Sequence, residues 1–252
     1  MQFTGLLWFA LTLLPLVFLQ RLLHREIQIL LFLLTRSKPL TIGVFSMLFF
    51  PGVFLHELSH YLMAKLLRVR TGRFSLIPQS LSNGNLQLGY VETEKTDFVR
   101  DSLIGLAPLI AGTLFVAYAG VYKMQLNTLW EVFRNGQFDL FWMGVGLVPD
   151  MPDFYLWFYL IFAVSSTMLP SESDRHAWLP LGIWAGILFA VALFVGAGGW
   201  MLENIAPLLD SFLRSVALLF GFSNIVHVIL LLPLMALRRT ITYILQVDVV
   251  RR

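Results

Sequence analysis

The chain contains no cysteine and few charged residues, and each shortage excludes a class of protein. Without cysteine, no disulfide frames the fold, and any metal ion must be bound by His, Asp or Glu rather than by thiolate. Charged residues make up 13% of the sequence and hydrophobic ones 58%, whereas about a quarter of a soluble domain is charged. Linkers rich in Gly, Ser or Pro and internal repeats are also missing. The composition therefore predicts an integral membrane protein with a single domain over residues 1–252.

The net charge of +3 is small, and the basic residues lie beside apolar segments. This pattern is typical of contacts with lipid head groups of the bilayer, and it gives no reason to expect binding of DNA or RNA. The apolar segment 3–19 lacks a basic leading segment and a small-residue cleavage site. We therefore expect a retained span there rather than a signal peptide.

Six apolar segments are long enough, or nearly so, to cross a bilayer, which takes about 20 helical residues. They cover residues 3–19, 41–67, 102–122, 154–169, 179–201 and 212–237. Residues 21–38 have an apolar centre too brief to cross, so we expect an interfacial or re-entrant helix there. The expected fold is an all-α polytopic membrane protein with about six transmembrane helices, a core over 41–178 and peripheral helices over 1–40 and 179–252.

Lys and Arg gather mainly on one side of this six-span topology. Eleven of them lie on the side that holds the segments after the second, fourth and sixth spans, against six on the other side. Because the side richer in Lys and Arg is usually cytoplasmic, we expect those three segments to face the cytoplasm. The count becomes ambiguous if residues 21–38, with their four basic residues, form a re-entrant element.

His56, Glu57 and His60 form an H-E-x-x-H motif inside the apolar segment 41–67. Residues four apart share one face of a helix, so both imidazoles can bind one zinc ion while Glu57 takes a proton from the attacking water. Ionisable groups within a spanning helix cost about 2.5 to 3.5 kcal/mol each, so three of them within five residues indicate a functional site. The alternative is a helix end at the membrane interface, where these groups are merely solvated.

A catalytic zinc site needs a third protein ligand, and Asp174 is the favoured candidate. It follows the fourth span and Pro170, on the same side of the membrane as His60 in the six-span topology. Irregular backbone at membrane depth is tolerated where it lines a cavity, which allows a carboxylate to reach a buried metal ion. Glu172 is the competing ligand and His176 the next, and a solvated loop acid is the alternative role for Asp174.

These features resemble the site-2 protease family of intramembrane zinc metalloproteases over residues 44–174. Besides the H-E-x-x-H motif, three elements are similar to those of the family: Leu88-Gly89-Tyr90-Val91 to its glycine-aromatic-valine strand, 107–109 to its alanine-glycine-proline helix entry, and 170–174 to its proline-then-aspartate element. The chain also departs from the family pattern. Ser166 or Thr167 stands where the family has Asn, no Gly follows Asp174, and the Pro-to-Asp spacing is one residue shorter.

The resemblance implies an endopeptidase that cleaves in or next to the spanning segment of a transmembrane protein substrate. It implies Zn²⁺ held by His56, His60 and Asp174, with Glu57 as the general base. A catalytically inactive relative that binds membrane-protein clients is the alternative function. We expect an integral protein of a bacterial or archaeal plasma membrane, with the active site toward the cytoplasmic side.

A hairpin signal lies between the second and third spans, where segments 72–77 and 86–91 flank an Asn83-Gly84 turn. The resemblance implies a strand edge beside the zinc, in which Leu88, Gly89, Tyr90 and Val91 hold the substrate. A transmembrane helix shields its own peptide bonds, so it must be unwound, and a free strand edge can hold the extended form by backbone pairing. A hairpin that only caps the bundle is the alternative.

Two polar residues, Asn224 and His227, lie within the last span. They are candidates for lining a gate or a substrate path. A helix-to-helix hydrogen bond inside the bundle is an equally good interpretation.

Overall fold

The structure, a computed structural model, describes residues 4–80 and 86–246, and it consists mainly of helices. The helices are α1 (Gly5–Thr35), α2 (Lys38–Leu66), α3 (Phe98–Tyr118), α4 (Leu126–Arg134), α5 (Phe138–Leu147), α6 (Phe154–Ser165), α7 (Trp178–Phe194), α8 (Gly198–Asn204) and α9 (Ala206–Leu245). A π-helical turn, η1 (Ala119–Lys123), follows α3, and a 3-10 turn, η2 (Val148–Asp150), follows α5. The strands are β1 (Thr71–Ser75), β2 (Gln79–Ser80), β3 (Leu86–Gln87) and β4 (Tyr90–Thr93).

Four helices in the described part of the chain are long and apolar enough to cross a membrane: α1, α2, α3 with its η1 extension, and α9. Two bent pairs would each add one span. α5 and η2 meet α6 at 96°, and α7 meets α8 at 112°. The expected class, an all-α polytopic membrane protein, is therefore confirmed with four to six spans, while the count of six stays a prediction.

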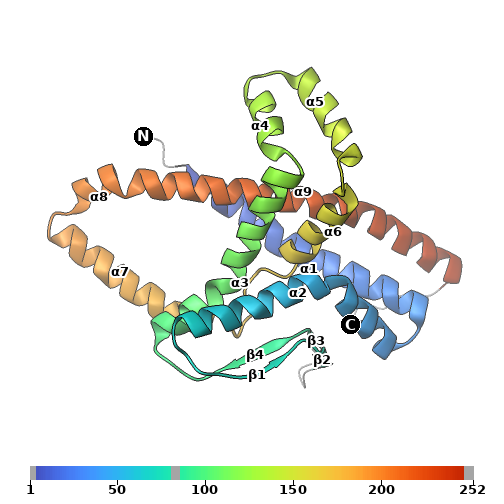
Figure 1. Cartoon of the computed structure of the whole chain (residues 1–252), viewed down its shortest axis with the longest axis horizontal. Coiled ribbons are helices and arrows are strands. Elements are labelled where there is room, and N and C mark those ends of the chain that lie inside the picture. The colour runs from blue at the N-terminus through green and yellow to red at the C-terminus, as the bar shows by residue number, and fades with distance from the viewer. Residues whose placement is uncertain (1–3, 81–85, 247–252) are drawn as a thin grey trace.

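The segment 21–38 is not a separate interfacial or re-entrant helix, because α1 runs through most of it without a break (Figure 1). Leu23 and Ile27 are buried in the main core, so this stretch continues the inner face of the first helix. The chain breaks only at Arg36, which adopts a left-handed conformation with φ of 51°, and Pro39 lies in the first turn of α2. The apolar centre was too short to cross alone, but it lengthens the preceding span.

Other boundaries also differ from the hydropathy pattern. The segment 154–169 contributes only α6, which ends at Ser165, and the segment 179–201 bends between α7 and α8. Residues 126–147 form α4 and α5, which the sequence analysis did not predict. Both helices are too short to span, and α4 mixes polar with apolar residues, so neither gives the signal of a transmembrane segment.

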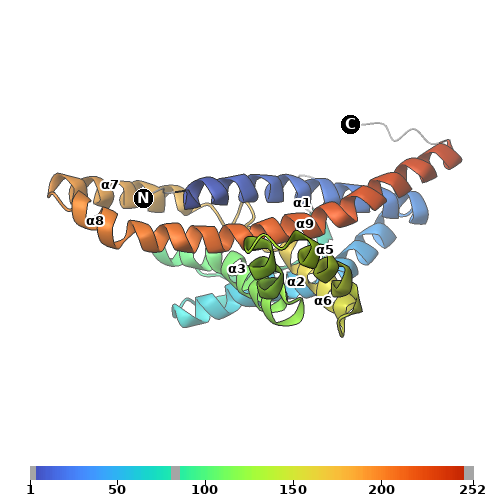
Figure 2. The ribbon, with the colours of Figure 1, turned by 90° about the horizontal axis from the view of Figure 1, so that it is seen from above.

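The two longest helices, α1 and α9, run side by side along much of the molecule (Figures 1 and 2). The main core lies where they meet α2, α3 and α6. Within it the Phe49 ring of α2 packs against Phe45 and Phe162, with ring centroids 4.7 and 5.3 Å apart. This aromatic packing holds α2 against α6, the helix that leads into the loop of Asp174.

Helix α7 differs from the core helices, because none of its residues is buried and it is apolar on all sides. It stands away from the main bundle in Figure 1. A helix that is apolar all round suits the interior of a membrane, where lipid covers the faces that protein leaves open.

Helix α3 begins directly after Asp97, whose carboxylate caps its first turn. It accepts backbone hydrogen bonds from Val99 at 3.1 Å and Arg100 at 3.0 Å. The bond from Arg100 is the main cause that holds the pKa of the Asp97 carboxyl below its usual range. The cap fixes the start of the helix that passes beside the motif.

The strands lie beside α2 and form two small antiparallel sheets (Figure 1). β1 pairs with β4, with Phe74 opposite Val91, and β2 pairs with β3. The expected strand over Leu88 to Val91 is partly wrong, because Leu88 and Gly89 connect β3 to β4 and the strand begins at Tyr90. The Asn83-Gly84 turn lies outside the described residues.

Candidate metal centre

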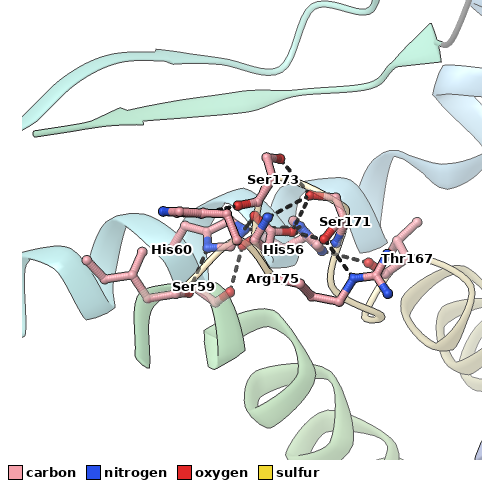
Figure 3. A network of polar contacts seen from close by, with 10 residues as sticks. His56, Ser59, His60, Thr167, Ser171, Ser173 and Arg175 are labelled. Atoms are coloured by element: carbon pink, nitrogen blue, oxygen red, sulfur yellow. Dashed lines mark hydrogen bonds and ion pairs between the residues drawn. The ribbon is translucent and has the colours of Figure 1, made fainter. Parts of the chain in front are cut away.

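Three of the predicted site residues lie together. His56 and His60 come from α2, as Figure 3 shows, and Asp174 comes from the loop between α6 and α7. The Nε2 atom of His60 is 3.2 Å from Nε2 of His56 and 3.3 Å from Oδ1 of Asp174, and His56 Nε2 is 3.7 Å from Asp174 Oδ2. Ligands about 2.0–2.2 Å from a tetrahedral zinc ion are about 3.3 Å apart, so the spacing fits. Within the described residues, this is the group of His and acidic side chains arranged to hold a metal ion.

The other nitrogen of each imidazole fixes the tautomer. His56 Nδ1 lies 2.6 Å from the carbonyl of Thr167, and His60 Nδ1 lies 2.8 Å from the carbonyl of Ile104. A carbonyl only accepts, so each Nδ1 carries the proton and donates, which leaves a lone pair on each Nε2. The two lone pairs and the Asp174 carboxylate therefore converge without a donor among them, and a cation at their centre would satisfy all three.

The acceptor for His60 is available because of a proline. In a helix, the N–H of Pro108 would bond to the carbonyl of Ile104, but proline has no N–H. The Ile104 carbonyl is therefore free to accept from His60. Pro108, within the segment 107–109 compared with a helix entry above, thus contributes directly to the orientation of one histidine.

The acceptor for His56 is available because α6 has ended. Thr167 lies two residues after Ser165, the last residue of α6, so no further turn of the helix supplies an N–H to its carbonyl. Its side-chain hydroxyl donates back to the Ala163 carbonyl at 3.0 Å, while its own carbonyl faces the His56 ring. The end of α6 thus serves as the outer support of the first motif histidine.

The carboxylate of Asp174 is held by its own loop. Its Oδ2 accepts from the Ser171 backbone N–H at 2.7 Å and from the Ser171 hydroxyl at 2.6 Å. These two hydrogen bonds stabilise the ionised form of the carboxyl group, which is the form that binds a metal ion. The residue is an anion with Oδ1 directed at His60.

The two competing ligand candidates lie elsewhere. Glu172 is exposed, and Nε2 of His176 lies 3.4 Å from a carboxylate oxygen of Asp101 on α3. The loop is further tied to α3 by Ser102, whose hydroxyl donates to the Ala177 carbonyl at 3.1 Å. The structure thus brings Asp174, and neither Glu172 nor His176, to the motif histidines.

Gly105 explains how α3 and this loop approach so closely. A Cβ built on Gly105 would overlap the backbone carbonyl oxygen of Asp174. Only glycine leaves room there, because a backbone atom cannot swing aside as a flexible side chain can. The sequence analysis did not single out this residue.

Glu57 is buried on α2, next to His56 in the chain. The connection between β3 and β4 passes directly beside it, because a Cβ on Gly89 would lie 3.2 Å from the Glu57 Oε1 atom. The strands therefore run next to the metal centre, as the close view also shows (Figure 3). Of the four predicted substrate-binding residues, Leu88 and Gly89 lie in the connection before β4, with Gly89 against Glu57, while Tyr90 and Val91 lie in β4.

The polar residues of the last span make helix-to-helix hydrogen bonds. Asn224 donates from its side-chain amide to the Thr12 carbonyl of α1 at 2.9 Å. His227 lies 3.0 Å from the hydroxyl of Ser166, just past the end of α6. This supports the second of the two interpretations given above.

No family model, no curated protein and no solved structure matches the chain. The interpretation of the site therefore rests on the geometry of its residues. This geometry defines a candidate metal centre of two histidines and one aspartate, with a buried glutamate alongside, in a polytopic helical membrane protein.

Proposed function

We propose that the protein is a zinc-dependent intramembrane endopeptidase of the site-2 protease type. The observation that carries the proposal is that two imidazole lone pairs and one carboxylate converge beside Glu57. The two imidazoles and Glu57 belong to α2, a helix apolar enough to span a membrane. Two histidines and one carboxylate are a usual ligand set of catalytic zinc, and they leave a fourth position open for water or substrate.

The side chains divide the chemistry between them. His56, His60 and Asp174 would hold Zn²⁺, which when bound acidifies a water molecule and polarises a peptide carbonyl. Glu57 takes a proton from the attacking water and then gives a proton to the departing amine. Its buried position beside His56 suits this task, because the base must lie within hydrogen-bond reach of the water that it activates.

The substrate of this proposal is the spanning segment of another membrane protein. Its helical peptide bonds are shielded, so the segment must be extended before hydrolysis. β4 pairs with β1 on one edge, and the sheet in the described residues has two strands, so the other edge of β4 is open. An extended peptide added there would pass near Glu57, since the chain reaches β4 through Gly89.

The proposed orientation puts the metal centre toward the cytoplasmic side. The motif lies in the last third of α2, and the chain directly after it carries Lys65, Arg68, Arg70 and Arg73. Such clusters are retained on the cytoplasmic side, where they contact anionic lipid. We propose a bacterial or archaeal plasma membrane as the location.

Purified full-length protein in lipid nanodiscs tests the proposed function. We expect one zinc ion per chain and cleavage of a transmembrane peptide substrate that a chelator abolishes and added zinc restores. The Glu57→Gln variant serves as the matched control that keeps the ligands. Stoichiometric binding of the peptide without any cleavage would contradict the proposed enzymatic activity and would favour the alternative, an inactive protein that binds membrane-protein clients.

A further inference from the structure

Ser166, the residue directly after α6, is held from two long helices at once. The side-chain amide of Gln20 on α1 donates to the Ser166 carbonyl at 2.5 Å. The Ser166 hydroxyl lies 3.0 Å from Nε2 of His227 on α9. Ser166 and His227 are both fully buried. Two helices that contribute no ligand thus converge on one residue at the edge of the metal centre.

The direction of the bond to His227 follows from its other nitrogen. His227 Nδ1 lies 2.7 Å from the backbone carbonyl of Ser223, which can only accept, so Nδ1 carries the proton. Nε2 therefore accepts, and the Ser166 hydroxyl donates to it. A serine hydroxyl at a helix end otherwise bonds to nearby backbone, so His227 determines where this hydroxyl points.

Ser166 is joined by a peptide bond to Thr167, the residue that supports His56. Thr167 follows it, and the Thr167 carbonyl accepts from His56 Nδ1 at 2.6 Å. A rotation of the Ser166 backbone is passed on through the planar Ser166–Thr167 peptide, so it moves Thr167 and would shift the Thr167 carbonyl unless the backbone angles of Thr167 compensated. The bonds to Ser166 from Gln20 and His227 oppose this rotation.

We propose that His227, acting through Ser166, is a positioning residue for the metal centre. It holds the turn at residues 166–167, whose carbonyl fixes the ring and the tautomer of His56. The inference rests on the metal-binding part of the proposed function and not on peptide cleavage. It gives the buried histidine of α9 a role in metal binding, although its ring touches none of the three ligands in the proposed geometry.

The experiment uses full-length protein with Co²⁺ as a spectroscopic substitute for zinc. The test variants are His227→Leu, Ser166→Ala and the double variant, and His227→Gln is the conservative replacement, because its amide oxygen can accept the Ser166 hydroxyl. Asn224→Leu is the matched control. Asn224 lies on the same helix and also bonds across to another helix, but its bond goes to Thr12 of α1. The readouts are Co²⁺ affinity against a competing chelator, the visible spectrum, and the melting temperature without metal.

We expect His227→Leu and Ser166→Ala each to weaken Co²⁺ binding by about tenfold and to change the visible bands, as loss of outer support does at other metal sites. The double variant should bind Co²⁺ no more weakly than the weaker of the two single variants. His227→Gln should keep most of the wild-type affinity for Co²⁺. Asn224→Leu should keep the wild-type affinity and spectrum even where its melting temperature falls.

Two results would overturn the inference: wild-type affinity and spectrum in His227→Leu, or an equal loss of affinity in Asn224→Leu. If the wild-type chain binds Co²⁺ but cleaves no peptide, the proposed endopeptidase activity is wrong, while the proposed positioning role of His227 still stands. A wild-type chain that binds no Co²⁺ would overturn both proposals.

Discussion

Gly89 lies against Glu57, where the connection between β3 and β4 passes the motif helix. A Cβ placed on Gly89 would come to 2.9 Å from the Glu57 Cγ atom and to 3.1 Å from the backbone oxygen of Ser75. The backbone oxygen is held in the strand pair, whereas the glutamate side chain can rotate. Any side chain at position 89 would therefore displace Glu57 first.

The Gly89→Ala variant should retain zinc and lose cleavage. We expect the rate to fall by roughly tenfold to 100-fold, since a misplacement of about 1 Å near the reacting atoms can cost that much. Zinc content and cleavage rate are measured on the same preparation. Gly43→Ala is the control, because a Cβ on this α2 glycine meets no described atom within 4 Å. Equal losses of zinc and activity in Gly89→Ala would point to misfolding instead.

Glu57→Gln should bind zinc as the wild type does, because Glu57 is not among the three grouped ligands. The amide cannot take up a proton, so turnover should fall below detection. Metal analysis and a gel-based cleavage assay suffice to check this. Near-normal proteolysis by the variant would remove Glu57 from the proposed mechanism.

Asp174→Ala should lower zinc occupancy sharply, since it leaves two of three protein ligands. Glu172→Ala is the matched control in the same loop, and its exposed side chain should make no difference. Both proteins are dialysed against a weak chelator before metal analysis. If the Glu172 variant loses the metal and the Asp174 variant keeps it, the ligand assignment is wrong.

The ligand candidates could be predicted because their signals are local. The spacing of His56 and His60 is a property of one helix, and Pro170 separates the preceding apolar segment from the acidic loop. The choice between Asp174 and Glu172 is also decided nearby, but by the Ser171 hydrogen bonds and by the space that Gly105 leaves. Those contacts depend on how the loop meets α3, which no periodicity reveals.

The supports of the two histidines could not be predicted. His60 bonds to a carbonyl 44 residues away and His56 to one 111 residues away, so both depend on the packing of α2 against α3 and α6. One signal was available. Pro108 inside a predicted span frees the carbonyl four residues before it, but the sequence does not say which donor will use that carbonyl.

The helical class was predictable, whereas the helix boundaries were not. Hydropathy divides α1 at Arg21 and Arg25, yet the helix continues because its inner face stays apolar and Glu26 pairs with Arg238 of α9. A buried acid that meets a partner 212 residues away is invisible to a window of about 20 residues. The short α4 and α5 fall below the length that such a window detects.

The ion pair between Glu26 and Arg238 gives a prediction of stability. Only 1% of the Glu26 side chain is exposed, and its other partner, Arg25 at 3.4 Å, is 59% exposed, so Arg238→Met would leave a buried charge with the more solvated partner alone. Removing one partner of a buried pair typically costs up to about 3–5 kcal/mol, which Arg25 should reduce, and a second change, Glu26→Leu, should recover part of the loss. The free energy of unfolding in detergent is the measurement. Arg239→Met, on the exposed side of the same helix, should leave the free energy of unfolding nearly unchanged. If it destabilises the protein as much as Arg238→Met does, the loss does not come from the ion pair with Glu26.

The open edge of β4 can be tested with proline, which removes an N–H. The Glu94 N–H donates to the Arg70 carbonyl at 3.0 Å, so it faces β1. N–H groups alternate along a strand, so that of Glu92 also faces β1 and that of Val91 faces the open edge.

Val91→Pro should therefore abolish capture and cleavage of an extended substrate while zinc content and the melting temperature stay near wild type. Glu92→Pro should instead unpair β4 from β1 and lower the melting temperature. Val91→Ala should be mild, because edge pairing uses the main chain. Substrate cross-linking, cleavage, zinc content and melting temperature are measured for each variant. Normal cleavage by Val91→Pro would show that the two-stranded sheet caps the bundle and that substrate is held elsewhere.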